Sequence, residues 1–496
     1  MSEEESGSGS DATGGSDVVR RERFSGGPAR GFLSSLESDE RIFEADLAVD
    51  RAHVVMLAEQ GIVDEVSAGE ILGALADVEE AGHAALPDGE DVHAAIETAV
   101  VERVGDVGGR MHTARSRNDE VAACLRYRLR EDLLDAVERT LELREVLAEV
   151  AGEHPRTVMP GFTHLQPAQP TTVGHYLLSY ESALRRDTGR LFDAYDRTNR
   201  SPLGAAAFAG TTFDVDRERT AELLGFDGVI ENSMDASSAR DFLVESTAAV
   251  ASLATGLSGI AEDLVVFSNR GLVELDDDYA STSSIMPQKV NPDTMELVRA
   301  TAGDAAAGLN GLLTTLKGLP RAYNRDLQRA HGHAFSAIDA VSEATAVVAG
   351  AVATAHWPER ALAEAAGEGF STATGIADLL ASSGVPFRTA HEVVALAAES
   401  VDAGGADYAA LDAAAREVLG GPLESHVDPE AVETALDPTE SVASRDSFGG
   451  PAPEAVAGAL DRAEERHEAD TETLAERHGA LVDAADRLDR EVSGYV

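Results

Sequence analysis

The sequence predicts a mainly α-helical protein of three helical domains, organised around a central bundle of long helices. Between about residues 119 and 356, five long segments carry apolar residues at helical spacing, and polar clusters lie between them. No Val- and Ile-rich alternating run predicts a substantial sheet. The clearest apolar stripe repeats every four residues, at Val121, Leu125, Leu129, Leu133, Val137 and Leu141. These observations favour a helix bundle with its chemistry in the loops at the helix ends.

The chain divides into a tail and three predicted domains. The first residues are mostly Ser, Gly, Asp and Glu, a composition typical of disorder. One of the early short helices is predicted to start at Asp91-Val92-His93, and a highly charged helix is predicted from Pro453 to Arg490. The predicted parts are a disordered acidic tail (1–18), an N-terminal helical domain (19–118), the central long-helix bundle (119–361) and a small C-terminal helical domain (362–496).

Composition excludes several classes of function. The formal net charge of −49 argues against nucleic acid as a partner, because its phosphates would be repelled. The same charge suits molar salt, where the Debye length falls to about 3 Å and self-repulsion is screened. No stretch of about 18 apolar residues lacks charge, so no membrane span is expected. Cys124 is the single cysteine, which excludes an intrachain disulfide and suits a cytoplasmic location. No GxGxxG, P-loop, HExxH or CxxC motif predicts a nucleotide or metal site.

The stretch Ser281–Asp293 carries the strongest chemical signal. It has four hydroxyl residues in a row, followed by Lys289, one of two lysines in the chain. A cation near a hydroxyl favours loss of the hydroxyl proton, so we predict a mobile catalytic loop. The alternative is a serine-rich surface loop leading into a helix, with Asn291 as the N-cap and Pro292 as the first helical residue. That geometry explains neither the serines nor the lysine.

Three further polar clusters lie between helical segments. Residues 109–119 include Arg115 and Arg117, which are two positions apart, and Asn118 or Asp119 is expected to cap the long helix that follows. Residues 161–170 place His164 in a loop bounded by Pro and Gly. The third cluster covers residues 317–328. Each cluster alone could be a capping turn with surface arginines or a structural histidine.

Together the clusters resemble the motifs of a known family. STSSIMPQKVNPD resembles the GSSxMPxKxN loop of the fumarase/aspartase superfamily, whose members release fumarate by β-elimination. GRMHTARSRND and PGFTHLQPAQP are similar to the HTGRSRND and THLQxAQP elements of argininosuccinate lyases, as is LKGLPRAYNRDLQ. The resemblance runs from about Phe32 to Pro453, and the SRND and YNRDLQ elements narrow it to that family. The scarcity of lysine resembles proteins of salt-loving archaea.

The resemblance implies a reaction and a set of roles. The reaction is the reversible splitting of 2-(N-arginino)succinate, a small-molecule substrate, into arginine and fumarate without a metal or organic cofactor. Ser283 is implied as the base, Lys289 as the cation that lowers its pKa, and His164 as the second acid–base group or its positioner. Residues implied to hold the substrate are Ser35, Ser116, Arg117, Asn118, Thr163, Asn291, Tyr323 and Gln328. The family also implies a homotetramer, with one superhelical bundle and active sites shared by three subunits.

The sequence departs from the family pattern at two informative positions. Val290 stands where these lyases usually have a second lysine, which leaves a fumarase or an aspartase as an alternative. His331 stands where the family usually has a substrate-binding lysine. A third possibility is a non-catalytic structural relative, but the retention of Ser283, His164 and Lys289 together argues against it.

Overall fold

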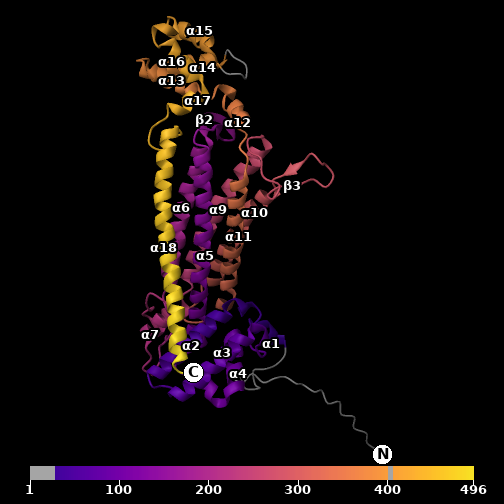
Figure 1. The fold of residues 1–496 in the computed structure, drawn as a ribbon, viewed down its shortest axis with the longest axis vertical. Coiled ribbons are helices and arrows are strands. Elements are labelled where there is room, and N and C mark those ends of the chain that lie inside the picture. The colour runs from indigo at the N-terminus through magenta and orange to yellow at the C-terminus, as the bar shows by residue number, and fades with distance from the viewer. Residues whose placement is uncertain (1–27, 400–405) are drawn as a thin grey trace, which may run out of the picture.

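The structure, a computed structural model, describes residues 28–399 and 406–496; the acidic tail predicted for residues 1–18 lies outside them. The body of the protein is an elongated bundle of five long helices, as the sequence predicted (Figure 1). Helix α5 packs against α6 and α11, and α9 packs against α6, α10 and α11. The five are α5 (Arg117–Glu153), α6 (Val173–Thr198), α9 (Asp241–Asn269), α10 (Asp293–Leu316) and α11 (His331–Thr354).

Helix α5 starts with a capping box. Ser116 Oγ accepts a hydrogen bond from the Asn118 N–H at 3.3 Å, and the Ser116 N–H donates to Asp119 Oδ1 at 3.0 Å. The N-cap is therefore Ser116, and the predicted cap at Asn118 or Asp119 is wrong. Asp119 is the third helical residue, and its side chain accepts the hydrogen bond from the Ser116 N–H. The predicted apolar stripe is buried from its second member onward, at Leu125, Leu129, Leu133, Val137 and Leu141.

A group of short helices covers one end of the bundle (Figure 1). Asp91 caps α4 by accepting a hydrogen bond from the Ala94 N–H at 2.8 Å, as the sequence predicted. Apolar residues of α2, α3 and α4 continue the hydrophobic core of the bundle, which fixes this end against α5. The elements are α1 (Pro28–Leu33), η2 (Ser38–Ile42), α2 (Phe43–Glu59), α3 (Glu65–Ala81), η3 (His83–Ala85), α4 (Val92–Val104) and η4 (Gly105–His112).

Two short antiparallel hairpins interrupt the helices. The first joins α5 to α6 and pairs Thr163 with Gln166 next to its turn. The second lies between α9 and α10 and pairs Ser281 with Asn291. Within the described residues these are the only sheets, which confirms a mainly α fold. The strands and small helices of the connections are β1 (Val158–Thr163), β2 (Gln166–Thr172), α7 (Arg217–Leu223), α8 (Ser233–Ser238), β3 (Ser281–Thr282), β4 (Val290–Asn291) and η5 (Arg325–Arg329).

The second hairpin corrects one predicted helix start. Asn291 lies in β4, and Pro292 is the N-cap of α10, so the helix begins at Asp293. The sequence placed this boundary one residue too early, because Asn291 is held in the hairpin by its pairing with Ser281. Ser281 Oγ also donates a hydrogen bond to the Asp293 carboxylate, which ties the hairpin to the first turn of α10.

A small helical unit lies at the other end of the bundle and has a hydrophobic core of its own (Figure 1). The fully buried side chains of this core include Ile376, Leu380, Val393, Leu411, Leu423 and Val432. The elements between the bundle and α18 are α12 (Glu359–Ala366), η6 (Glu368–Phe370), α13 (Ala373–Ser382), α14 (Phe387–Glu399), α15 (Tyr408–Val418), η7 (Leu423–Ser425), α16 (Pro429–Leu436) and α17 (Pro438–Ala443).

The last helix, α18 (Pro453–Ser493), runs back along the bundle (Figure 1). It packs against α5 and α6, and its buried apolar residues belong to the core of the bundle. The prediction that residues 362–496 form one C-terminal domain is therefore wrong for this helix. Most of its charged residues face solvent. Its few buried residues are Val456, Ala463, Leu474, Ala484 and Leu488, and the helix packs against α5. Arg144 of α5 lies between Glu181 of α6, at 3.1 Å, and Asp470 of α18, at 2.6 Å.

Helix α10 has an apolar face that this chain leaves partly uncovered. By length and composition alone, the helices Asp241–Asn269 and Arg325–Thr354 could cross a membrane, although 44% and 50% of their most apolar stretches are buried inside the protein. A core helix of a bundle passes the same test. Helix α10 buries four of its 24 residues, and Leu297 on it is 71% exposed. Helix α10 is therefore the least covered of the five bundle helices.

Candidate active site

A cavity of about 200 Å³, here named the N-terminal cavity, lies where the short N-terminal helices meet the bundle. Gln328 Nε2 donates a hydrogen bond to Leu33 O at 3.0 Å across 295 residues of chain, so the fold itself brings these segments together. Five of the predicted substrate-holding residues line the cavity: Ser35, Arg117, Asn118, Tyr323 and Gln328.

Hydrogen bonds and ion pairs fix several side chains of the N-terminal cavity. Ser35 Oγ donates to Asp39 Oδ2 at 2.7 Å, and Arg117 Nη1 lies 3.2 Å from Asp91 Oδ2. Burial raises the pKa of Tyr323, so its phenol stays protonated and can donate a hydrogen bond. The cavity therefore presents donors and acceptors of fixed orientation, which suits a polar, charged ligand.

Ser116 is a predicted substrate residue that does not line this cavity. Its hydroxyl and amide are both used in the capping box of α5. The first turn of α5 is also tied to the chain before α7, because Asn118 Nδ2 donates to Ala207 O at 3.1 Å. In this chain Ser116 positions the turn that carries Arg117 and Asn118.

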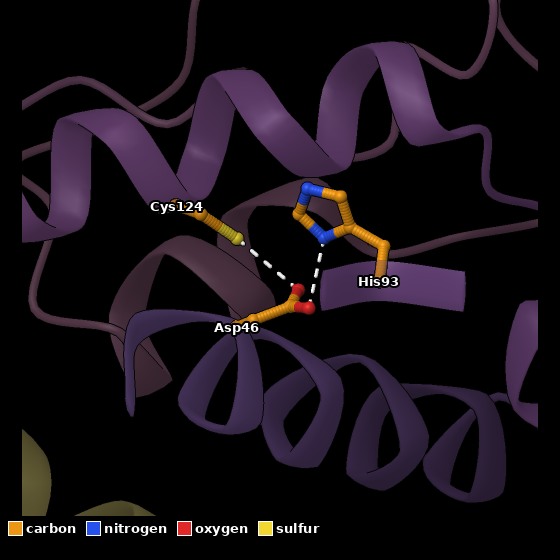
Figure 2. A group of neighbouring side chains, drawn as sticks. All are labelled: Asp46, His93 and Cys124. Carbon is orange, nitrogen blue, oxygen red and sulfur yellow. Dashed lines mark hydrogen bonds and ion pairs between the residues drawn. The ribbon is translucent and has the colours of Figure 1, made fainter. Parts of the chain in front are cut away.

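Buried ionic groups lie behind the N-terminal cavity. His93 lines the cavity, and its Nδ1 lies 2.8 Å from Asp46 Oδ2 (Figure 2). Burial lowers the pKa of His93, but Asp46 and then Glu120 outweigh it and raise the pKa to about 10. His93 is therefore a cation at neutral pH. Cys124 Sγ donates to the other oxygen of Asp46 at 3.3 Å, and burial keeps Cys124 a thiol by raising its pKa.

Arg115 completes this ion-pair network. Its Nη1 lies 2.5 Å from Asp50 and its Nη2 lies 2.8 Å from Glu120. Two sets of side chains in the network share Asp46, and the donor atoms of each set lie within 4.8 Å of one another, a spacing that a metal ion could use. The sets are Asp46, His93 and Cys124, and Asp46, Asp50 and Glu120. Each carboxylate is nevertheless engaged by a protein cation, since His93 holds Asp46 and Arg115 holds the other two. The network stabilises the wall of the cavity through fixed, paired charges.

Further residues of the N-terminal cavity had no predicted role. His331 lines it, and burial, followed by Arg240 and His93, lowers the pKa of His331 to about 4. The imidazole is therefore neutral and cannot supply the charge of the lysine that the family resemblance expects there. Glu90, Arg240 and Arg325 also line the cavity, and Arg325 forms an ion pair with Glu90. Arg325 belongs to the YNRDLQ element but had no predicted role, and the convergence of all three residues depends on the fold.

The β1–β2 hairpin carries Thr163 and His164 at its turn. His164 and Leu165 both have a φ of 58°, a left-handed conformation that non-glycine residues seldom adopt. Arg270 of the chain after α9 holds the turn by donating to Leu165 O at 3.1 Å. His164 lines a second cavity, of about 420 Å³, between the hairpin and α9. The predicted loop is thus a constrained hairpin turn.

Ser283 lies in the loop between β3 and β4, close to the backbone that surrounds it. Its Oγ accepts hydrogen bonds from the N–H groups of Ile285, at 3.4 Å, and Met286, at 3.2 Å. Its own N–H donates to Lys289 O at 3.0 Å, so the loop folds back on itself. The Lys289 side chain is exposed. Backbone donors aimed at a hydroxyl oxygen favour its anionic form.

The three groups of predicted residues do not meet within one chain (Figure 1). The N-terminal cavity lies at the end of the bundle that carries α1 and α4. The β1–β2 hairpin lies at the opposite end, near α12 and α17, and the β3–β4 loop projects from the side of the bundle (Figure 1). The polar clusters of a single chain therefore form three separate surfaces.

Comparison with known sequences gives consistent matches along the chain. Residues 32–306 match the family described as lyase, and residues 370–443 match argininosuccinate lyase C-terminal. The argininosuccinate lyase of Natronomonas pharaonis is 77% identical over 485 residues, covering 98% of each chain. That of Halobacterium salinarum is 67% identical and covers 98% of this chain and 100% of its own. The argininosuccinate lyase of Methanosarcina acetivorans is 44% identical and covers 97% of this chain and 99% of its own.

Solved structures agree with these matches. EDDS lyase in complex with formate superimposes with a TM-score of 0.85 and 34% identity, over 95% of this chain and 96% of that one. The class II fumarase of Schistosoma mansoni superimposes with a TM-score of 0.71 over 83% of this chain and 93% of that one. Because its identity is 16%, this match supports the fold alone. These relatives confirm the resemblance that the motifs indicated. The chain belongs to the argininosuccinate lyase family.

Proposed function

We propose that this chain splits argininosuccinate reversibly into arginine and fumarate, in active sites shared between subunits. The observation that carries the proposal is the N-terminal cavity, where the residues that distinguish this family converge from segments far apart in the sequence. Membership of the family supports the same reaction. The arginine part of the substrate is expected to occupy this cavity, held by Ser35, Arg117, Asn118, Tyr323 and Gln328, while Ser116 orders the turn that presents two of them.

The difficult step is removal of a proton from a carbon next to a carboxylate, because a second negative charge then develops on that carboxylate. We assign the base to Ser283, whose oxygen accepts two backbone N–H groups and would be stabilised as an alkoxide. Lys289, in the same loop, adds a compact positive charge. Asn291 is assigned to the carboxylate at the fumarate end.

The leaving guanidine needs a proton when the carbon–nitrogen bond breaks. His164 is assigned as the second acid–base group or as its positioner, with Thr163 beside it as a substrate contact. The constrained hairpin turn supports this assignment, since a strained backbone at a histidine is more common at functional sites than elsewhere. Side chains of the protein fill every role in this scheme, so the scheme calls for no metal or organic cofactor.

A tetramer is part of the proposal. The three groups of site residues form separate surfaces on one chain, and a shared site would bring surfaces of different subunits together. The partly uncovered apolar face of α10, with Leu297 and Leu313 exposed, would contribute to the interface that such an assembly requires. We expect the tetramer to work in the cytoplasm, where its substrate is a soluble metabolite.

Fumarate release tests the reaction directly. Purified protein in molar KCl should release fumarate from argininosuccinate, seen as a rise in ultraviolet absorbance. Malate and aspartate serve as control substrates, because Val290 resembles fumarases and aspartases at that position. Faster turnover of either control would replace the proposed reaction by that of another superfamily lyase. No turnover of any of the three would favour a non-catalytic structural relative.

Mixed oligomers test the shared site. Ser283→Ala and Tyr323→Phe should each be nearly inactive alone, because each removes one part of every site. Co-expressed with two different affinity tags and purified through both, they should recover activity, since some sites in a mixed tetramer receive both intact groups. Doubly tagged protein without recovered activity would show that each site is built from a single chain.

A further inference from the structure

The turn that carries His164 has a backbone conformation that its residues disfavour. Thr163 pairs with Gln166, so His164 and Leu165 are the two residues of the loop, and both have a φ of 58°. Two positive φ angles are the pattern of a type I′ turn, which is dominated by Asn and Gly. A histidine and a leucine in this conformation cost free energy, because their Cβ atoms crowd the backbone. Contacts outside the turn must therefore hold it.

Arg270 supplies two such contacts from 105 residues further along the chain. Its Nη2 donates a hydrogen bond to Leu165 O at 3.1 Å, and its guanidinium carbon lies 4.7 Å from the centre of the Phe162 ring. The Phe162 ring in turn lies 5.9 Å from that of Phe267 on α9, which is 6% exposed. One arginine thus contacts a strand of the hairpin and its turn, and the core of the bundle supports both.

The backbone of Arg270 is itself fixed by the end of α9. Arg270 is the C-cap of this helix, and Gly271 follows with a φ of 69°. The Gly271 N–H donates to Ser268 O at 3.1 Å. The Leu272 N–H donates to Phe267 O at 2.9 Å, which completes a Schellman motif. The side chain of Arg270 therefore extends from a rigid helix end toward the hairpin.

We propose that Arg270 is a positioning residue, which fixes His164 in the geometry of its acid–base step by holding the strained turn. This inference rests on the proposed function, which gives His164 a part in proton transfer. Such a transfer requires hydrogen-bond distance, and a displacement of about 1 Å can cost about 10²-fold in rate. No described carboxylate forms an ion pair with Arg270, so both described contacts of its side chain go to the hairpin.

Steady-state kinetics of Arg270→Met test the proposal, since methionine keeps an unbranched side chain but has no donor. In molar KCl, kcat and kcat/KM for argininosuccinate should both fall by about 10- to 100-fold, with KM unchanged, because positioning acts on the transition state. Arg270→Lys should recover part of the loss by restoring a charged donor. Arg156→Met is the matched control, because Arg156 lies just before the same hairpin with a side chain that is 75% exposed. Its kcat should stay within about twofold of the unmodified enzyme.

A second change in the turn separates positioning from general damage. Glycine adopts a positive φ without strain, so Leu165→Gly reduces the need for Arg270. Alone it should leave kcat close to that of the unmodified enzyme, and added to Arg270→Met it should recover most of the lost kcat. Hydrogen–deuterium exchange of residues 158–172 should be faster in Arg270→Met and slower again in the double variant. Light scattering should show the same oligomer for all of them.

Three results would overturn the proposal. The first is an unchanged kcat in Arg270→Met, and the second is a raised KM with kcat unchanged, which would make Arg270 a substrate contact. The third is a double variant as slow as Arg270→Met. Failure of the proposed function is seen separately, as no turnover of argininosuccinate by the unmodified enzyme. The exchange measurement would then still decide whether Arg270 holds the turn.

Discussion

Ser283 and Ser284 are adjacent serines in different surroundings, which makes them a matched pair. Ser283 is half-buried and accepts two backbone N–H groups, whereas Ser284 is exposed. We expect Ser283→Ala to lower kcat by at least about 10²-fold, the usual cost of losing a general base, with the oligomer intact. Ser284→Ala should have a much smaller effect. Steady-state kinetics with light scattering on both variants decides between them, and equal or reversed losses would mean that the base is misassigned.

Lys289 tests whether position 289 needs an ammonium or merely a positive charge. The chain favours arginine almost everywhere, so an arginine would be expected if charge alone mattered. A guanidinium is wider and spreads its charge away from Ser283. We expect Lys289→Arg to lose about 2–4 kcal/mol of transition-state stabilisation in kcat/KM, with little change in the melting temperature. Activity within about twofold of the unmodified enzyme would refute this role.

His93 links stability to pH. Its pKa is about 10 in the folded protein, against 6.5 for the free group, so its contribution to stability is complete below pH 6.5 and is lost as the pH rises through 10. The free energy of unfolding should therefore fall with pH in this window, approaching about 1.4 kcal/mol per pH unit from this one proton. Denaturation in molar KCl at several pH values checks this against His93→Gln, which should lack that part of the slope. If the free energy of unfolding fell equally with pH in the unmodified enzyme and in His93→Gln, the raised pKa of His93 would be contradicted.

Residue types in a motif could be recognised from the sequence, but their ionisation could not. The SRND and YNRDLQ elements identified Arg117, Asn118, Tyr323 and Gln328, and the structure brings all four to one cavity. The absence of a carboxylate ion pair at Arg240, among the described residues, could not be predicted, because it depends on which side chains surround Arg240 after folding. Burial and neighbours, which decide a pKa, are properties of the packed chain.

At the scale of elements, long helices with regular apolar spacing could be predicted. For α18, the helix could be predicted but not its position against the bundle. Its existence followed from composition, but its assignment to the small C-terminal domain was wrong. Its buried positions are few and irregularly spaced, at Val456, Ala463, Leu474, Ala484 and Leu488. A stripe this sparse does not reveal which neighbour covers it, and a long-range ion pair to Arg144 leaves no local signal in the sequence.

The contact between α18 and the bundle can be tested at Arg144, which is fully buried between Glu181 and Asp470. Arg144→Gln should destabilise the protein by about 3–5 kcal/mol, because it leaves the buried Glu181 without a cation. Arg139→Gln, on the same helix, is the control, since its pair with Glu142 is exposed and contributes at most about 0.5 kcal/mol. Denaturant titrations compare the two. Equal midpoints would mean that the buried ion pairs of Arg144 do not contribute to the stability of the fold.

At the scale of the whole molecule, two opposing properties meet. The partly uncovered apolar face of α10 favours association, and the net charge of −49 on each chain opposes it. Buried charges are largely compensated by partners within the chain, as in the network around Arg115. The remaining negative charge is spread over the surface, where dissolved ions can screen it. Salt concentration should therefore decide which property prevails.

Dilution from molar KCl to below about 0.1 M should dissociate or unfold the oligomer. The Debye length rises from about 3 Å at 1 M to about 10 Å at 0.1 M, so neighbouring acidic side chains on facing subunits begin to repel one another. Light scattering and activity measured during the dilution should show the loss of mass and of fumarate release together, because the proposed shared sites need the assembled oligomer. Sucrose strengthens apolar burial without screening charge, so it should not substitute for KCl. An intact, active oligomer below about 0.1 M salt would show that the surface charge does not control assembly.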